Sequence, residues 1–221
     1  MDFVAGARED SSAVANFYLF KNGGNGNFVK QLIASIPGSN KVGTFAVADF
    51  DKDGFKDFVA PIYGSGIYLF VNNGDNTFTW SLLPLSVNPL EAKEGDFNED
   101  GNMDFVITQY FERKVYLYKN DGTGKFEVQL LFDIGDVYPG NLGDARTGDI
   151  TVGRFNEDGH LDIIVDDCDL SATGGAYLYV GDGTGGFDYL SQVYSRPQIG
   201  AYIYGVDSFD LDKDGYMDLI L

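Results

Sequence analysis

The chain has 221 residues, of which 44% are hydrophobic and 15% aromatic, as in a folded globular protein that buries a sizeable core. The 34 acidic and 15 basic residues give a formal net charge of −19, which excludes nucleic acid and membrane insertion as favoured modes of interaction. The single cysteine, Cys168, excludes an intrachain disulfide, and no apolar run is long enough for a membrane helix.

The predicted elements are short strands, and the second repeat shows them in chain order. Alternating apolar and aromatic residues predict strands over 44–50, 58–63, 67–71 and 78–83, with an acidic loop at 49–57, glycine-rich turns at 64–66 and 72–76, and a connector through Pro89. A sustained 3.6-residue apolar period is absent from the sequence, so we expect almost no helix.

Two motifs recur along the chain. The acidic loop beginning DFDKDG at 49 returns at 96, 154 and 210, and the hairpin pattern FYLFKNGGNGNF at 17–28 returns at 67–78, 115–126 and 176–187. Four antiparallel strands in a unit of about 50 residues are typical of the blade of a β-propeller. The sequence therefore predicts an all-β propeller of about four four-stranded blades.

The whole chain, 1–221, is expected to be one propeller domain or part of one. The repeats fall near 1–43, 44–94, 95–148, 149–205 and 206–221, running from strand 2 of a first blade to strand 2 of a last. Two arrangements stay open: a piece of a larger propeller, or a closed four-bladed ring with one surplus copy of strand 2. The surplus strand favours the piece, or oligomerisation through unpaired terminal strands.

The first acidic loop has the composition of a cation site. Carboxylates at alternating positions converge when a tight turn wraps them, and Gly54 permits such a turn. Hard oxygen ligands without cysteine or histidine favour Ca²⁺ over softer metals. The predicted ligands are Asp49, Asp51, Asp53, the carbonyl oxygen of Phe55, and Asp57. For a single copy, an Asx-rich turn is the alternative, but repetition at matching places favours the cation. An EF-hand is excluded because loop position 12 is not a glutamate.

Two other loops repeat these ligand positions, and one departs from them. The full copies offer Asp96, Asn98, Asp100, Asn102 and Asp104, and then Asp210, Asp212, Asp214, Tyr216 and Asp218. The departing copy has Arg154 at the first ligand position and keeps Asn156, Asp158, His160 and Asp162. We expect the Arg154 guanidinium to replace the metal by pairing with Asp158 or Asp162, and His160 to be an exposed bystander. About three Ca²⁺ sites result, with a doubtful fourth at 154–162.

The loop pattern D-x-[DN]-x-D-G-x-x-D and hairpins such as YLFVNNGDNTF resemble the FG-GAP and VCBS-type repeats of integrin-like β-propellers across essentially the whole chain. The resemblance implies calcium in the loops and an adhesion, lectin-like or enzyme-accessory role at the cell surface or outside the cell. Extracellular calcium modules bind in the ~10⁻⁴–10⁻³ M range, which also favours an extracellular setting. The N-terminus lacks the features of a signal peptide, so we expect any such signal to lie outside this chain.

Catalysis is not expected. His160 is the single histidine, which excludes a nucleophilic triad, and the G-x-G-x-x-G match at 181–186 precedes a strand and not the helix of a dinucleotide site. A carboxylate pair for glycoside cleavage stays open, although we expect the acids outside the loops to be solvated: Asp133, Asp136, Asp144, Asp149, Asp166, Asp167 and Asp169.

A partner is expected on the face opposite the acidic loops, where the long connectors 133–147, 166–176 and 195–205 lie. Aromatic residues of strand 3 are expected to pack between blades: Tyr68, Phe70, Tyr116, Tyr118, Tyr177 and Tyr179. Connector aromatics offer faces for sugars or a protein: Tyr63, Tyr110, Phe111, Tyr138, Tyr202 and Tyr204. The sequence predicts a recognition module for glycans or cell-surface proteins; the alternatives are a propeller of a secreted polysaccharide-degrading enzyme and a structural spacer.

Overall fold

The computed structural model describes residues 1–7, 14–37, 41–84, 88–137, 147–167, 174–195 and 205–221. Over these residues the chain is all-β apart from one helical turn, α1 (Ile134–Val137). Within the same residues, there is no helix long and apolar enough to cross a membrane.

The strands form five antiparallel sheets, each built from neighbours in the sequence. The first contains β1 (Phe3–Ala7), β2 (Val14–Asn22) and β3 (Phe28–Pro37). The second contains β4 (Lys41–Val42), β5 (Ala46–Ala48), β6 (Asp57–Tyr63), β7 (Gly66–Asn72) and β8 (Phe78–Leu82). The third contains β9 (Pro89–Gly95), β10 (Asp104–Gln109), β11 (Lys114–Asn120) and β12 (Phe126–Asp133). The fourth contains β13 (Thr147–Gly153), β14 (Asp162–Asp167), β15 (Gly175–Gly181) and β16 (Phe187–Ser195), and the last contains β17 (Asp207–Phe209) and β18 (Asp218–Ile220).

These sheets confirm the predicted blades. The strands expected over 44–50, 58–63, 67–71 and 78–83 correspond to β5, β6, β7 and β8, with ends that differ by a few residues. Both β4 and β5 pair with β6, so the first strand of this blade is interrupted. The third and fourth sheets are complete four-stranded units.

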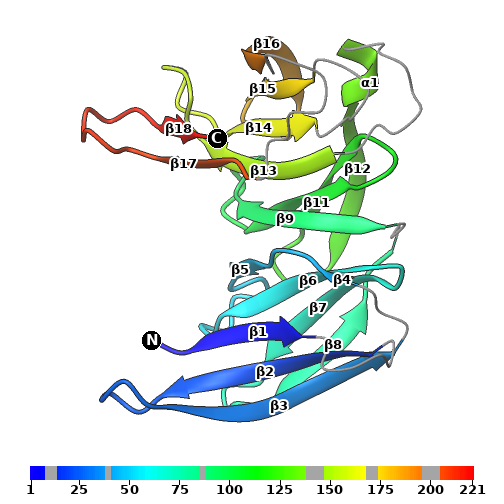
Figure 1. Cartoon of the computed structure of the whole chain (residues 1–221), viewed down its shortest axis with the longest axis vertical. Coiled ribbons are helices and arrows are strands. Elements are labelled where there is room, and N and C mark those ends of the chain that lie inside the picture. Colours follow the sequence, from blue (N-terminus) through cyan, green and yellow to red (C-terminus); the bar gives the residue numbers. More distant parts are fainter. Residues whose placement is uncertain (8–13, 38–40, 85–87, 138–146, 168–173, 196–204) are drawn as a thin grey trace.

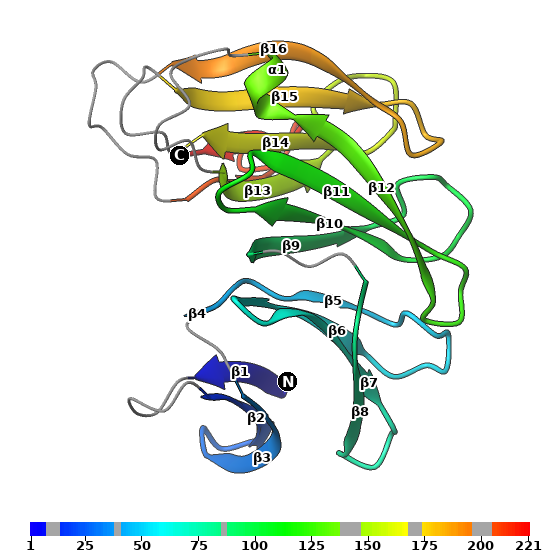
Figure 2. The ribbon, with the colours of Figure 1, turned by 90° about the vertical axis from the view of Figure 1, so that its right-hand side faces the viewer.

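The sheets follow one another in space as they do in sequence (Figure 1). In Figure 1 they run from β1–β3 at the bottom to β13–β16 at the top, and the β17–β18 pair projects to the left. The first strands of successive sheets contact one another, β5 with β9, β9 with β13, and β13 with β17, and Figure 2 shows β5 beside β9. Among the described residues, no strand pairing joins the first sheet to the last.

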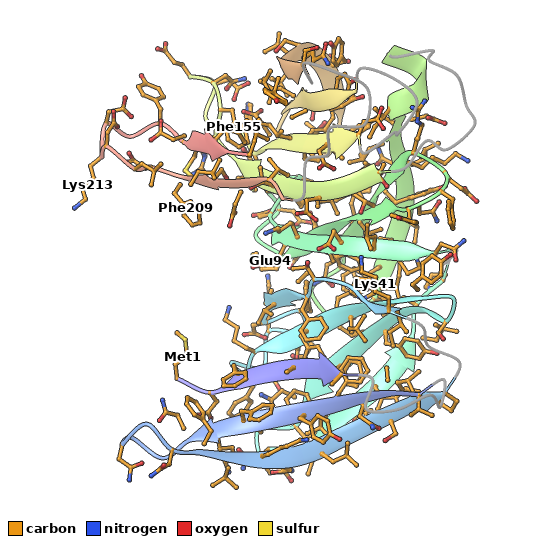
Figure 3. The ribbon with its side chains drawn as sticks, in the orientation of Figure 1. Met1, Lys41, Glu94, Phe155, Phe209 and Lys213 are labelled. Carbon is orange, nitrogen blue, oxygen red and sulfur yellow. The ribbon has the colours of Figure 1, made fainter. Side chains whose placement is uncertain are left out.

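Four apolar clusters fill the spaces between successive sheets (Figure 3). The middle strands β6, β10 and β14 have a sheet neighbour on each side and apolar contacts on both faces, which explains the consecutive apolar residues at 58–62, 105–107 and 163–165. Polar contacts add to the packing, because the Glu94 carboxylate on β9 accepts a hydrogen bond from the N–H of Val47 on β5, at 3.1 Å. The sheets are therefore held together by side chains between blades.

The prediction for the strand 3 aromatics is confirmed. Phe70, Tyr118, Tyr177 and Tyr179 are at most 2% exposed, and Tyr68 and Tyr116 are partly buried. Tyr179 stacks on Phe132 of the preceding sheet, with ring centroids 3.5 Å apart. These rings contribute to the packing between the blades.

Candidate metal centres and the opposite face

Each acidic loop connects the first and second strands of its sheet, and the β-hairpin between strands 3 and 4 lies at the same end. The loop of one blade contacts the hairpin of the next: the Phe50 carbonyl accepts hydrogen bonds from Gly124 N, at 3.1 Å, and from Asn120 Nδ2, at 2.7 Å. The acidic loops therefore share one face of the molecule and take part in the contact between blades.

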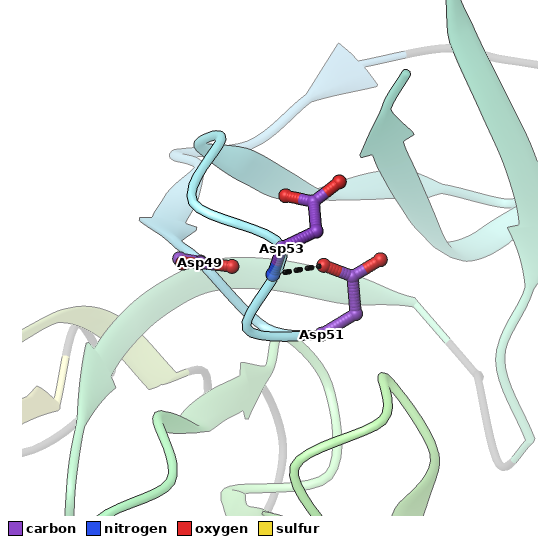
Figure 4. A group of neighbouring side chains, drawn as sticks. All are labelled: Asp49, Asp51 and Asp53. Carbon is purple, nitrogen blue, oxygen red and sulfur yellow. Dashed lines mark hydrogen bonds between the residues drawn. The ribbon is translucent and has the colours of Figure 1, made fainter. Parts of the chain in front are cut away.

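The first loop brings three carboxylates together. Asp49, Asp51 and Asp53 each offer one oxygen, and these oxygens lie within 4.8 Å of one another (Figure 4). Gly54, at φ 93°, turns the chain, and its N–H donates to Asp49 Oδ2 at 3.0 Å. The other oxygen, Asp49 Oδ1, is buried without a hydrogen-bond partner. A buried oxygen of this kind within a carboxylate cluster fits Ca²⁺, which would satisfy it.

The last aspartate of each loop ties the loop to its own sheet. Asp57 is fully buried, and its two oxygens accept the N–H groups of Phe50 and Asn72, both at 2.9 Å. Asp104 and Asp162 accept two backbone N–H groups in the same way. Burial raises the pKa of Asp57 to about 6, opposed by these two N–H groups and reinforced by Asp51 and Asp53. Burial likewise raises the pKa of Asp104 to about 6.

The two other full loops differ in how far their carboxylates converge. In the last loop, Asp210, Asp212 and Asp218 each place an oxygen within 4.8 Å of the others. In the loop at 96–104, Asn98 takes the place of one carboxylate, and its Nδ2 donates to Asp100 Oδ2 at 2.9 Å. Asp96 accepts the N–H groups of Asp100 and Gly101. The ligand roles of all the residues predicted in these loops stay predictions, those of Phe55, Asn102, Asp214 and Tyr216 among them.

The loop at 154–162 differs from the expectation at Arg154. This residue pairs with neither Asp158 nor Asp162; its Nε donates to the carbonyl oxygen of Gly159 at 2.7 Å. Both aspartates already accept other donors, Asp158 from His160 N and Asn156 Nδ2, which explains the difference.

His160 is not a bystander. Its Nδ1 lies 2.7 Å from Glu99 Oε1 in the preceding loop, and this hydrogen bond raises the pKa of His160. Tyr216, at the matching position of the next loop, donates its hydroxyl to Glu157 Oε1 at 3.3 Å. In these two loops the side chain at the seventh position therefore contacts the preceding loop, and the sequence of one repeat does not reveal this contact.

Three connector aromatics gather on the opposite face. The ring of Tyr63, the last residue of β6, lies 6.2 Å from the Tyr110 ring and 6.1 Å from the Phe111 ring; Tyr110 and Phe111 lie between β10 and β11. The Tyr110 and Phe111 rings are 4.9 Å apart, and Phe111 is 50% exposed. We call these three residues the aromatic cluster. The other connector aromatics lie outside the described residues (Tyr138, Tyr202 and Tyr204), as do most of the three long connectors.

The expectation that the acids outside the loops are solvated is wrong for three of them. Asp166 and Asp167 are fully buried and Asp149 is partly buried, because they lie on the packed strands β13 and β14. Asp167 forms an ion pair with Arg113 of the third sheet, at 3.2 Å. Burial, with Asp149 nearby, raises the pKa of Asp166 to about 8. Asp144 and Asp169 lie outside the described residues.

One buried acid was not predicted from the sequence: Glu91 on β9 is 8% exposed. Burial raises the pKa of Glu91 to about 7, and Asp149 adds to the effect. One signal was available: Glu91 and Asp149 stand at the same place in their repeats, five residues before the first residue of the acidic loop.

The repeats and the fold of this chain are similar to those of known proteins. A family model described as an FG-GAP-like repeat matches residues 1–60, 96–165 and 167–221. The comparison with curated proteins finds no match. Among solved structures, a lectin of Agrocybe aegerita described as recognising non-reducing terminal N-acetylglucosamine is similar, with a TM-score of 0.62 and 19% identity over 99% of this chain. The chain spans 60% of the length of that lectin, and the likeness concerns the fold. The Tc holotoxin pore of Photorhabdus luminescens matches 97% of this chain with 12% of its own, at 15% identity and a TM-score of 0.38, too low to support an argument.

Proposed function

The chain belongs to the FG-GAP-like repeat family, and on that premise we propose that it is a non-catalytic recognition module that binds glycans, with Ca²⁺ as a structural ion. The fold it shares with the Agrocybe aegerita lectin, which is described as recognising N-acetylglucosamine, supports a sugar as the class of ligand. A fold alone does not fix a function, so the proposal depends on a specific surface of this chain.

The aromatic cluster is the observation that carries the proposal. Tyr63 ends β6, and Tyr110 and Phe111 follow β10 of the neighbouring blade, so all three are anchored to the sheets. Aromatic faces stack on the apolar faces of sugar rings, while tyrosine hydroxyls offer hydrogen bonds to sugar hydroxyls. A half-exposed Phe111 beside two tyrosines therefore supports glycan binding on the face opposite the acidic loops.

Calcium would be held by the acidic loops, with Asp49, Asp51 and Asp53 in the first and Asp210, Asp212 and Asp218 in the last as the best-assembled ligands. Bound Ca²⁺ would neutralise carboxylates that otherwise repel one another, and so fix each loop against its blade. We also propose an extracellular or cell-surface setting, because modules of this kind bind calcium in the ~10⁻⁴–10⁻³ M range.

A glycan array probed with the wild-type chain in excess Ca²⁺ tests the proposal. Phe111→Ala is expected to abolish or strongly weaken the positive signals, because it removes the most exposed ring of the cluster. Trp80→Ala, on the outer strand β8, is the matched control at an aromatic that is 46% exposed, and should leave the signals unchanged. EDTA should lower binding indirectly, through the stability of the blades. An array without any positive glycan would contradict the proposal.

A second candidate function, a propeller of a polysaccharide-degrading enzyme, has one observation in its favour. Glu91 and Asp166 have pKa values raised to about 7 and about 8, within the range that suits a general acid near neutral pH. Release of reducing or unsaturated ends from acidic polysaccharides would support this candidate.

Two further proposals concern association. One is a cell-surface protein as partner, and the other is association through the edge strands β1 and β18. Size-exclusion chromatography with light scattering can examine both.

A further inference from the structure

A cavity of about 550 Å³ lies between the first and second sheets, at the end of the molecule where the acidic loops lie. Phe3 and Val4 of β1 line it on one side, and Phe58 of β6 and Phe78 of β8 line it on the other. None of the three residues of the aromatic cluster lines it, and we call it the first-blade cavity.

The next interface shows which kind of side chain fills the equivalent place. Between the second and third sheets, the Phe50 ring lies edge to face against Phe105 and Phe126, with centroids 6.1 and 5.6 Å away. Phe58 and Phe78 occupy the same two positions of the repeat in the second sheet, and both line the first-blade cavity. Phe50 is the second residue of an acidic loop. The cavity is therefore the equivalent place for the second residue of an acidic loop that approaches β1.

Asp2 is arranged to receive the backbone of such a loop. Its Oδ1 accepts the N–H of Asn22 at 2.8 Å, as Asp57 Oδ1 accepts the N–H of Asn72. The other oxygen of Asp57 accepts the N–H of Phe50 at 2.9 Å. Among the described residues, no backbone N–H is bonded to the other oxygen of Asp2. β1 pairs only with β2, so the other edge of β1 can also receive a strand.

One face of the first sheet exposes rings whose equivalents in the third sheet are covered. Phe3 stacks on Phe20 with centroids 4.6 Å apart, and the Phe28 ring lies 5.2 Å from that of Phe3. Phe3 and Phe28 are 47% and 45% exposed. Phe105 occupies the position of Phe3 in the third sheet and is 0% exposed, because residues of the second sheet pack on it. The exposed rings of the first sheet therefore form a surface of the kind that contacts a preceding blade.

The last sheet carries the counterpart of these features. β17 leads into the last acidic loop, whose second residue, Leu211, is 60% exposed. The N–H of Leu211 donates to Asp218 Oδ2 at 2.9 Å, which is the bond that Asp2 is arranged to accept. The pair β17–β18 projects from the body of the molecule (Figure 1), and none of the three residues of β18 is buried. Little packing therefore opposes the replacement of β18 by another strand.

We propose that β17 and the last acidic loop of one copy of this chain dock on the first sheet of a second copy, so that the two copies build one four-stranded blade. β17 would pair with β1 of the second copy in place of β18, and Leu211 would enter the first-blade cavity. The resulting order, β17–β1–β2–β3, is that of the complete sheets. The exposed rings Phe3, Phe20 and Phe28 would then pack against the fourth sheet of the first copy.

The proposal deepens the association through edge strands proposed above, because it names the strand that is replaced and the cavity that is filled. It does not depend on glycan binding. The contact exists only in the assembly, so Leu211 stays exposed in the dilute monomer.

Disulfide cross-linking between two different variants tests the pairing. Ile220 lies opposite Asp207 in the β17–β18 pair, and Val4 occupies the position of Ile220 in β1. In a Cys168→Ser background with excess Ca²⁺, a mixture of Val4→Cys and Asp207→Cys chains should give a disulfide-linked dimer on non-reducing gels. Either variant alone should not give it. Circular dichroism checks that each variant is folded.

The alternatives give different cross-links. A mixture of Val4→Cys and Ile220→Cys chains reports pairing of the edge strands as they stand, and a cross-link in that mixture alone would overturn the proposal. A chain that carries both Val4→Cys and Asp207→Cys reports pairing within one copy. A link inside that chain, without any mixed dimer from the single variants, would also overturn the proposal.

Sedimentation velocity with matched variants locates the contact. Leu211→Glu should weaken self-association at least about tenfold, because it would bring a carboxylate among phenylalanine rings. Leu190→Glu adds the same charge at a leucine of β16 that is 57% exposed, away from the docking surface, and should change nothing. A wild-type chain that stays monomeric at the concentrations used for cross-linking, or equal self-association of the two variants, would overturn the proposal.

Discussion

Replacing Phe50 by alanine should destabilise the chain strongly, because its ring joins two blades. Phe50 is 0% exposed and packs edge to face against Phe105 and Phe126 of the next sheet, with ring centroids 6.1 and 5.6 Å away. Removing a fully buried phenylalanine ring costs about 3–5 kcal/mol, since the cavity collapses only in part. We expect a loss of about 4 kcal/mol, measured by urea unfolding in excess Ca²⁺ as a lower midpoint with an unchanged m-value.

The repeat supplies a matched control for this prediction. Leu211 stands at the equivalent position of the last acidic loop but is 60% exposed. Leu211→Ala should therefore cost less than about 0.5 kcal/mol, as surface substitutions generally do. A loss of less than about 1 kcal/mol for Phe50→Ala, or the same loss of unfolding free energy in both variants, would show that the Phe50 ring does not join the two blades.

Three further predictions follow from the described contacts. Asp166→Asn should gain stability relative to the wild type as pH rises from about 4 to about 8 and level off above that: burial raises the pKa of this carboxyl from its usual 3.8 to about 8, so over this range the folded wild type must keep a proton that the unfolded chain has lost. Melting temperatures from pH 5 to 9 check this, and a difference that does not grow with pH would count against it. Arg154→Asp should add one bound Ca²⁺ per chain in equilibrium dialysis, with Arg154→Ala as control, since it restores the first ligand position; an unchanged stoichiometry would contradict it. Gly122→Ala should cost at least about 1 kcal/mol, because Gly122 has φ 83° and a Cβ there would lie 2.5 Å from Asn102 Oδ1; a neutral effect in urea unfolding would show that the hairpin relaxes.

The repeated local patterns made the blades predictable. Alternation in FVAPIY and IYLFVN, with glycines at the turns, led to β6 and β7 almost residue by residue. The acidic loops were equally predictable. Asp, Asn and Gly at fixed spacing favour a turn whose carboxylates converge, as those of Asp49, Asp51 and Asp53 do.

Contacts between repeats were not predictable from the pattern of one repeat. His160 meets Glu99 at a distance of 61 residues along the chain, and Arg113 meets Asp167 across two sheets. Asp166 lies in a run of acids that resembles a solvated turn, yet the strand continues through it and packing buries it. In each case tertiary packing determines the environment of the side chain, and the local sequence does not reveal that environment.

The dependence of thermal stability on calcium tests the central claim most directly. We predict that the melting temperature of the wild-type chain rises with added Ca²⁺ up to millimolar concentration, on the order of the affinity of such modules, and falls in EDTA. Asp49→Asn combined with Asp51→Asn should reduce that rise, since both residues belong to the best-formed carboxylate group. A melting temperature that EDTA does not lower, and that Ca²⁺ does not raise, would contradict the account of the acidic loops as structural calcium sites.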